Sequence, residues 1–324
     1  MKGFQMLPQH WPVVVGIDGS DSALQAVCWG AAEAGRRRVG LRLVIAFEQT
    51  RADAAGEGFG EALLERARQR LAAAAAVAVR EAPDVDLEQL LVVGHPLSVL
   101  SAEGRQAQLV AIGDRGTGLG LPAGSVAVGL AVQAPCTVVV VRGPLRSGSD
   151  SAPVVLGVDG SRGSDAAIAF AFAAAAYRRV ALVAVHTWSD VTVEQEIAAQ
   201  LDWDAIEADT RRMLSGRLDG WAQEYPDVHV ERVITRDRPA SALLQHAARA
   251  QLVVVGAGGR GEFAGLLLGS VSHAVIHRAP CPVAVVRPVA TVDAIVVDGP
   301  RAPGEQPAGA PARVPGRGHP GRHP

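Results

Sequence analysis

Residues 251–270 read "QLVVVGAGGRGEFAGLLLGS", and this stretch decides the fold. Its first part is short, apolar and rich in valine, which indicates a buried strand. A glycine-rich loop follows, and Gly269-Ser270 opens a stretch that reads as a helix. In open α/β sheets, ligands bind outside the carboxyl ends of the strands, where such a loop lies. The stretch therefore predicts a strand of a parallel sheet and a loop shaped to hold a ligand.

The same kind of stretch occurs earlier in the chain, and the likeness extends far beyond the loop. Equivalent residues are 141 positions apart at Asp18 and Asp159 and 145 positions apart at Pro135 and Pro280. A period of this length is a whole domain, which predicts a tandem duplication and not a solenoid. The matching segments are "VVVGIDGSDSA" (13–23) with "VVLGVDGSRGS" (154–164), "QLVAIGDRG" (108–116) with "QLVVVGAGG" (251–259), and "GSVAVGLAVQAPCTVVVVR" (124–142) with "GSVSHAVIHRAPCPVAVVR" (269–287).

Each copy alternates short apolar runs with helical stretches, which predicts parallel strands covered on both faces. We expect an α/β fold of two tandem, doubly wound, five-stranded, Rossmann-like domains. The first copy should hold helices near 21–38 and 58–81 and strands at "PVVVGID", "LRLVIAF", "LEQLLVV", "QLVAIG" and "CTVVVVR". The second should hold strands at "PVVLGVD", "VALVAVHT", "VERVIT", "QLVVVG" and "CPVAVVR".

These elements give a layout for the whole chain. A Pro/Gly/Arg-rich tail lacks the apolar periodicity of a packed core, so we expect it to be disordered and solvated, although its arginines suit anionic partners. The expected parts are an N-terminal extension (1–11), a first domain (12–143), a linker (144–152), a second domain (153–288) and the tail (289–324).

Composition narrows the class of protein. The 324 residues are 48% hydrophobic and 20% charged with a net charge of −2, which supplies packed cores and argues against wholesale nucleic-acid binding. No apolar run reaches the roughly 18 residues of a membrane span, and the N-terminus lacks a signal-peptide core. Three cysteines fit a reducing compartment. We expect a cytoplasmic protein.

The only lysine is Lys2. A Walker A loop needs a lysine on the phosphates, a protein kinase needs one on its third strand, and Schiff-base enzymes need a buried one. The sequence excludes all three mechanisms.

The glycines of the 256–261 loop allow positive φ angles and close approach of the backbone to a ligand. Ser270 is predicted to stand at a helix N-terminus, where amides and the helix dipole favour an anion such as phosphate. The letters also spell G-x-G-x-x-G, but residues 263–287 lack the acidic residue that the dinucleotide fingerprint requires, so we reject that interpretation. A loop that merely turns tightly is the simpler alternative.

Gly256-x-x-Gly259, nine further residues and then Gly269-Ser270 resemble the nucleotide-binding pattern of universal stress proteins. The resemblance includes "GVDGS" after the first strand and "RAPCPVAVVR" at the last, and it covers both copies, about residues 12–288.

The resemblance implies that each copy binds ATP or another adenine nucleotide, with or without Mg²⁺. Asp159 would contact the nucleoside, and the backbone near Thr187 would line the adenine pocket. Arg260 would supply the cation that no lysine provides. Alternatively, Asp159 caps a helix and Arg260 is a solvated loop residue. The implied ligand residues of the second copy are Asp159, Gly160, Thr187, Gly256, Gly259, Arg260, Gly261, Gly269, Ser270, Val271 and Ser272, and those of the first are Asp18, Gly19, Phe47, Gly113, Gly116, Gly124 and Ser125.

The first copy departs from this pattern. Only seven residues separate Gly116 from Gly124, Thr117 stands in place of Arg260, and Ala127 in place of Ser272. The loop also holds Asp114 and Pro122, and a carboxylate beside phosphates would repel them. We therefore expect tighter nucleotide binding in the second copy.

Other candidate groups have plainer interpretations. His273 and His277 lie four apart on a predicted helix, but the glutamate of a metalloprotease motif is missing, so we interpret them as partly exposed helix residues. Cys136 and Cys281 have valine neighbours, which indicates buried thiols. His95 and His186 lie near strand ends, and either is a possible base.

The final strands "TVVVVR" and "PVAVVR" would be apolar edges if left unpaired. We expect them to pair with each other within the chain, and the unit to form a homodimer. The function predicted is that of a nucleotide-dependent regulatory module whose state an unidentified protein partner reads. A slow ATP hydrolase, using Asp159 or His186 as base, and a nucleotide-free scaffold are the alternatives.

Overall fold

The computed structural model describes residues 10–48, 59–116, 125–143, 151–161, 164–187, 203–258 and 268–287, and the statements below concern these residues. "First copy" means residues 12–143 and "second copy" residues 153–288.

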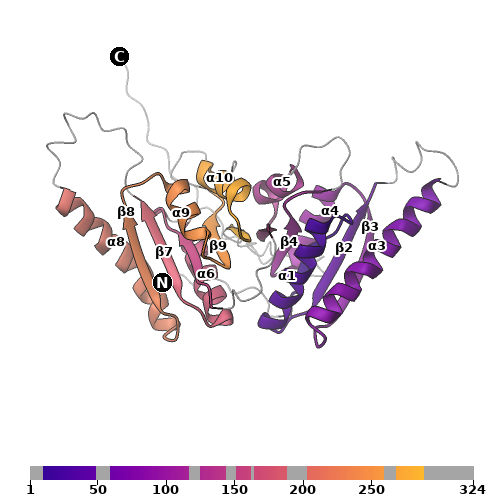
Figure 1. Cartoon of the computed structure of the whole chain (residues 1–324), viewed down its shortest axis with the longest axis horizontal. Coiled ribbons are helices and arrows are strands. Elements are labelled where there is room, and N and C mark those ends of the chain that lie inside the picture. The colour runs from indigo at the N-terminus through magenta and orange to yellow at the C-terminus, as the bar shows by residue number, and fades with distance from the viewer. Residues whose placement is uncertain are drawn as a thin grey trace, which may run out of the picture. The chain divides into compact units, whose positions relative to one another are not determined.

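The first copy alternates strands and helices as its sequence predicts (Figure 1). Three predicted elements match closely: strands 41–47 and 87–93 have the predicted bounds, and helix 21–38 ends one residue earlier. The elements are β1 (Val13–Gly16), α1 (Asp21–Arg37), β2 (Leu41–Phe47), α3 (Phe59–Glu81), β3 (Leu87–Val93), α4 (Pro96–Glu103), the 3₁₀ turn η1 (Gly104–Gln106), β4 (Leu109–Gly113), α5 (Ser125–Gln133) and β5 (Thr137–Val141).

The second copy repeats this order without the 3₁₀ turn among its described residues. Its elements are β6 (Val154–Gly157), α6 (Ser164–Arg178), β7 (Leu182–Thr187), α8 (Trp203–Glu224), β8 (Val230–Thr235), α9 (Pro239–Ala247), β9 (Leu252–Gly256), α10 (Ser270–Arg278) and β10 (Val283–Val286).

The strands form one sheet in the order β3-β2-β1-β4-β5-β10-β9-β6-β7-β8. All pairs are parallel except β5 with β10, which are antiparallel, with Val139 opposite Ala284. The prediction that the two final strands pair within the chain is confirmed. Because each final strand is apolar and buried, pairing removes two exposed edges at once.

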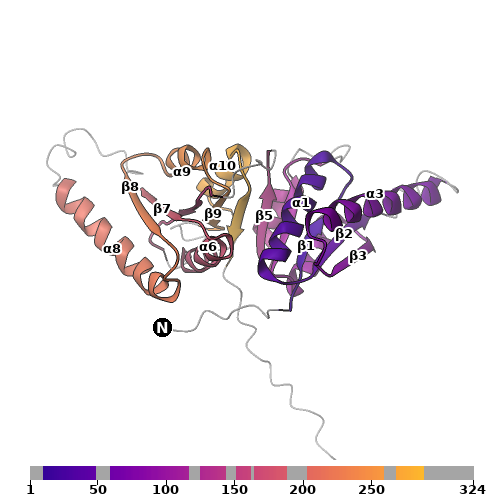
Figure 2. The same ribbon diagram turned by 60° about the horizontal axis from the view of Figure 1, so that its bottom comes forward.

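Helices cover both faces of the sheet, as runs of buried valines on the central strands require. Helices α1, α3, α6 and α8 pack in one buried layer, and α4, α5, α9 and α10 in the other. Figures 1 and 2 show α1 and α3 side by side. The outer strands β3 and β8 are less buried than the central ones, as their position at the two ends of the sheet predicts.

Candidate functional site

A cavity of about 320 Å³ opens in the first copy beyond the carboxyl ends of β1, β2 and β4, where α/β sheets bind ligands. Residues from seven elements and their loops line it: 16–18 and Ala23, 44–48, Leu63, Ala67 and Arg70, Pro96 and Leu100, 112–116, and 125–127. The cavity thus brings together Asp18, Phe47, Gly113, Gly116 and Ser125, which the sequence selected.

The turn after β1 is held by its own aspartate. Asp18 Oδ1 accepts hydrogen bonds from the amide of Ser20 (2.9 Å) and from its hydroxyl (2.7 Å). Gly19 between them has a φ of +85°, a conformation that favours glycine. Ser20, not the aspartate, is the N-cap of α1, because its Oγ accepts a hydrogen bond from the amide of Ala23.

The second copy repeats this turn. Asp159 Oδ1 accepts hydrogen bonds from the amide of Ser161 (2.9 Å) and from the hydroxyl of Ser164, the first residue of α6. Gly160 has a φ of +78°. In both copies the carboxylate is fixed at the carboxyl end of the first strand.

Gly113, at the end of β4, is a glycine because α1 lies against it. A Cβ at this position would lie 2.3 Å from Ser22 Oγ and 2.7 Å from the backbone carbon of Ser22. This close approach brings the loop after β4 to the first turn of α1. Gly124 lies outside the described residues, while Gly116 and Ser125 border the cavity on both sides of the segment 117–124.

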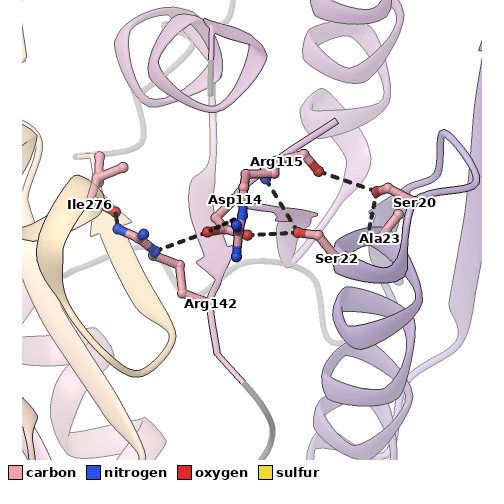
Figure 3. A network of polar contacts seen from close by, with 7 residues as sticks. All are labelled: Ser20, Ser22, Ala23, Asp114, Arg115, Arg142 and Ile276. Carbon is pink, nitrogen blue, oxygen red and sulfur yellow. Dashed lines mark hydrogen bonds and ion pairs between the residues drawn. The ribbon is translucent and has the colours of Figure 1, made fainter. Parts of the chain in front are cut away.

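Asp114 lines the cavity, but its carboxylate is paired with neighbouring side chains (Figure 3). Its Oδ2 lies 3.1 Å from Nε of Arg142 and 3.4 Å from Nε of Arg115, and its Oδ1 accepts a hydrogen bond from Ser22 Oγ (2.8 Å). Arg142 also donates from Nη1 to the carbonyl of Ile276, in α10 of the second copy (3.1 Å). The neighbouring arginines offset the charge that the sequence led us to expect beside the phosphates.

In the second copy, Gly256 ends β9, and Gly269 is the N-cap of α10, which begins at Ser270. The amide of Gly269 donates to the carbonyl of Ala257 (2.9 Å), which fixes where the helix starts. Ser272 is buried, and its hydroxyl donates to the carbonyl of Gly256 (2.6 Å), so this side chain supports the loop. Val271 packs against the apolar layer. Gly259, Arg260 and Gly261 lie outside the described residues.

The strand register shows which residue of the first copy is equivalent to Thr187. Val13 pairs with Leu41 in the first copy and Val154 with Leu182 in the second, an offset of 141 on both strands. Thr187 is therefore the counterpart of Ala46. The residue equivalent to Phe47 falls in the segment 188–202, outside the described residues.

Sequence reasoning missed two arginines that line the cavity, Arg70 on α3 and Arg115 after β4. Arg115 adjoins a loop glycine, so its proximity to the selected residues was a local signal. Arg70 gave none, because only the packing of α3 against the start of α1 brings it to the turn at Gly19.

The histidines occupy different environments. His186 is buried, and its Nδ1 lies 2.7 Å from the carbonyl of Val158, which only accepts, so Nδ1 carries the proton. His95 is the N-cap of α4 and lies 3.9 Å from Glu48. His273 and His277 are exposed, as predicted, with ring centres 4.5 Å apart. Burial and then His273 lower the pKa of His277.

Cys136 and Cys281 are buried, as their valine neighbours predict. Burial raises the pKa of Cys136 to about 12. Within the described part of the chain, no cluster of three or more His, Cys, Asp or Glu side chains is arranged to hold a metal ion. Of the described helices, none has the length and apolarity to cross a membrane.

The fold and this site define a class: a tandem pair of doubly wound α/β domains, each with a glycine loop and a fixed aspartate at the carboxyl ends of its strands. Residues 12–142 and 152–287 each match the model of the universal stress protein family. The chain belongs to this family.

Curated relatives match almost over their full length. Universal stress protein Rv2005c of Mycobacterium tuberculosis is 40% identical over 291 residues, which cover 85% of this chain and 96% of the relative. Universal stress protein Rv2623 of the same organism is 37% identical over 290 residues, with the same coverage of both chains. Among solved structures, a universal stress protein from Archaeoglobus fulgidus aligns with a TM-score of 0.63 at 18% identity, over 87% of this chain and 98% of that one. That likeness supports the fold alone.

Proposed function

We propose that this protein binds an adenine nucleotide, ATP, at the carboxyl end of each half of its sheet and acts as a nucleotide-dependent regulatory module. The observation that carries the proposal is the first-copy cavity, which collects Asp18, Gly113, Gly116 and Ser125 from three separate segments at one place.

The cavity suits such a ligand in size and chemistry. Its volume of about 320 Å³ lies within the range of small-molecule sites. Apolar side chains, among them Val44, Phe47 and Leu63, offer a surface for a base, and the carboxylate of Asp18 suits ribose hydroxyls or an amino group. The glycines let backbone amides approach phosphate oxygens.

Regulation follows from binding only if the nucleotide has different affinities for two states of the protein. The loops after β4 and β9 are the segments whose state the nucleotide would set, and a partner protein would read it. We also propose that the unit forms a homodimer and that the bound species is ATP, with or without Mg²⁺.

The test is to denature freshly purified protein, identify any released nucleotide by mass and determine its molar ratio to the chain. One or two equivalents of ATP support the proposal, and ADP or AMP would shift weight to the hydrolase alternative. No nucleotide, together with no heat of binding when ATP is titrated into the protein, would refute the proposal in favour of a scaffold.

A further inference from the structure

The long helix α3 brings a cationic side chain into the first-copy cavity. Arg70 lines the cavity, although it lies far in sequence from every loop of the site. Its side chain rests against Gly19: a Cβ built there would lie 2.4 Å from Arg70 Nε and 2.9 Å from its Cζ. The guanidinium group therefore lies next to the turn that fixes Asp18.

Five ionisable side chains line the described part of this cavity, and four of them have partners. Asp18 accepts two hydrogen bonds from Ser20, Glu48 lies 3.9 Å from His95, and Asp114 and Arg115 form an ion pair at 3.4 Å. The fifth is Arg70, which makes no hydrogen bond or ion pair with another described residue.

An arginine in this position needs an acceptor for its N–H donors. The side chain is partly buried, and its five N–H donors have no acceptor among the described residues of the protein. A guanidinium group matches phosphate oxygens in geometry as well as in charge. The missing partner of Arg70 is thus best supplied by an anionic ligand.

The second copy lacks this feature. Counted back from the last residues of α3 and α8, Glu81 and Glu224, the position of Arg70 is occupied by Met213. The arginine one turn further on, Arg217, donates to the carbonyl of Ser161 (3.0 Å) and to Asp165 (2.7 Å), so its guanidinium group is already engaged. Among the described residues near the two first-strand turns, the unpaired cation is thus found in the first copy.

We propose that Arg70 binds the phosphate groups of a nucleoside phosphate in the first copy, a role that rests on the nucleotide binding proposed above. Position 117 is threonine where the second copy has Arg260, and Arg70 supplies the cation from a different element. In the first-copy site, a cation on α3 then favours nucleotides over nucleosides.

The experiment uses the full-length chain and photolabelling with 8-azido-ATP and, separately, 8-azidoadenosine. Peptides from the two copies are quantified by mass spectrometry, so each site is followed independently. We expect Arg70→Gln to raise the concentration of 8-azido-ATP needed to label first-copy peptides by about ten- to a hundredfold, the value of a charge-assisted hydrogen bond. Labelling by 8-azidoadenosine, and labelling of the second copy by either probe, should stay unchanged.

Two variants serve as controls. Arg80→Gln removes an exposed arginine ten residues further along α3, about 15 Å away, and should label like the parent protein. Arg70→Lys keeps a cation without the planar fork and should retain part of the preference for 8-azido-ATP over 8-azidoadenosine.

Three outcomes would overturn the proposal. Equal weakening of both probes in Arg70→Gln would mean that Arg70 shapes the cavity or stacks on the base, and unchanged labelling would mean that it does not bind the ligand. First-copy peptides that ATP does not protect from labelling in the parent protein would also reject it. If second-copy peptides are labelled and protected in that case, the proposed function survives there, and if neither copy is labelled, the proposed function fails as well.

Discussion

Glu33 of α1 and Arg178 of α6 form an ion pair across the junction of the two copies, with an N–O distance of 2.5 Å. Their side chains are 0% and 2% exposed. Arg37, one turn along α1, donates from Nε to the same carboxylate (2.7 Å) and is also buried. A single carboxylate is therefore the shared ion-pair partner of two arginine side chains inside the protein.

The arginines and aromatic rings of this cluster are equivalent pairs from the two copies, whereas the carboxylate comes from the first copy only. Arg37 and Arg178 are equivalent in the two copies, as are Trp29 and Phe170. Arg37 lies over the ring of Phe170 (5.1 Å) and Arg178 over that of Trp29 (5.8 Å). The residue of the second copy that is equivalent to Glu33 is Ala174. The second copy therefore contributes an arginine to the cluster but no carboxylate.

We expect Glu33→Gln to lower the free energy of unfolding by about 3 kcal/mol, because it leaves two buried guanidinium groups without a counter-charge. Urea denaturation at neutral pH measures this. Glu65→Gln, which removes an exposed partner of Arg68, should change stability by less than about 0.5 kcal/mol. A similar loss of free energy of unfolding in both variants would contradict the explanation that burial makes the Glu33 ion pairs important for stability.

The same carboxylate should make stability depend on pH. Burial alone would raise the pKa of Glu33, but the charges of Arg178 and Arg37 outweigh it and lower the pKa from 4.5 to about 2. A folded pKa below the unfolded one gives stability that is present above pH 4.5 and is lost between pH 4.5 and 2. The difference in free energy of unfolding between the parent protein and Glu33→Gln should therefore shrink over this interval. A constant difference from pH 6 to 2 would show that Glu33 does not titrate there.

The two nucleotide sites should respond unequally to loss of their aspartates. We expect Asp159→Ala to weaken the tighter of two ATP-binding events at least tenfold, roughly the value of one or two hydrogen bonds to a charged group. Asp18→Ala should leave that event within about threefold, since we expect the shortened first loop to bind more weakly. Calorimetric titration of both full-length variants measures this, and equal losses would refute the asymmetry.

The three thiols should differ in reactivity, because the thiolate is the nucleophile. Cys136, with its pKa near 12, and the buried Cys281 should resist iodoacetamide at pH 8 in the native protein. Burial and then Glu81 also raise the pKa of Cys28, but this side chain is partly exposed and should react slowly. Peptide mass spectrometry before and after unfolding in urea checks the order, and rapid native labelling of Cys136 would be inconsistent with it.

Two glycine substitutions should have opposite effects on stability. Gly19→Ala places a Cβ at a positive φ and against Arg70, and should cost about 1–2 kcal/mol. Gly216→Ala lies within α8 with nothing within 4 Å of the new Cβ, and should stabilise by about 0.5–1 kcal/mol. Thermal unfolding distinguishes them, and a stabilised Gly19→Ala would show that the turn is not strained by a side chain.

Much of the fold is predictable because its signals are local. Valine-rich runs such as 137–141 identify buried strands, and the repeat of the pattern 13–23 at 154–164 fixes two copies in one order. The loop residues Gly113 and Gly116 were predictable for the same reason, since a glycine reports a backbone requirement at its own position.

Contacts between residues that lie far apart in the sequence leave no signal in the local sequence pattern. Asp114 reads as an unfavourable charge beside phosphates until Arg142, at the far end of β5, is seen to pair with it (Figure 3). Arg70 is one of several arginines on a long helix, and only its approach to Gly19 distinguishes it.

The sequence by itself determined that the protein is a duplicated α/β chain with a glycine loop and an aspartate in each copy, because periodicity, turns and motif spacing are properties of neighbouring residues. The tertiary structure alone decided which charges meet: Glu33 with Arg178, Asp114 with Arg142, and Arg70 with the first-copy cavity. Whether a charge is buried, paired or left facing a cavity depends on segments that folding brings together, and it is this placement that determines what each charged side chain contributes to stability and to binding.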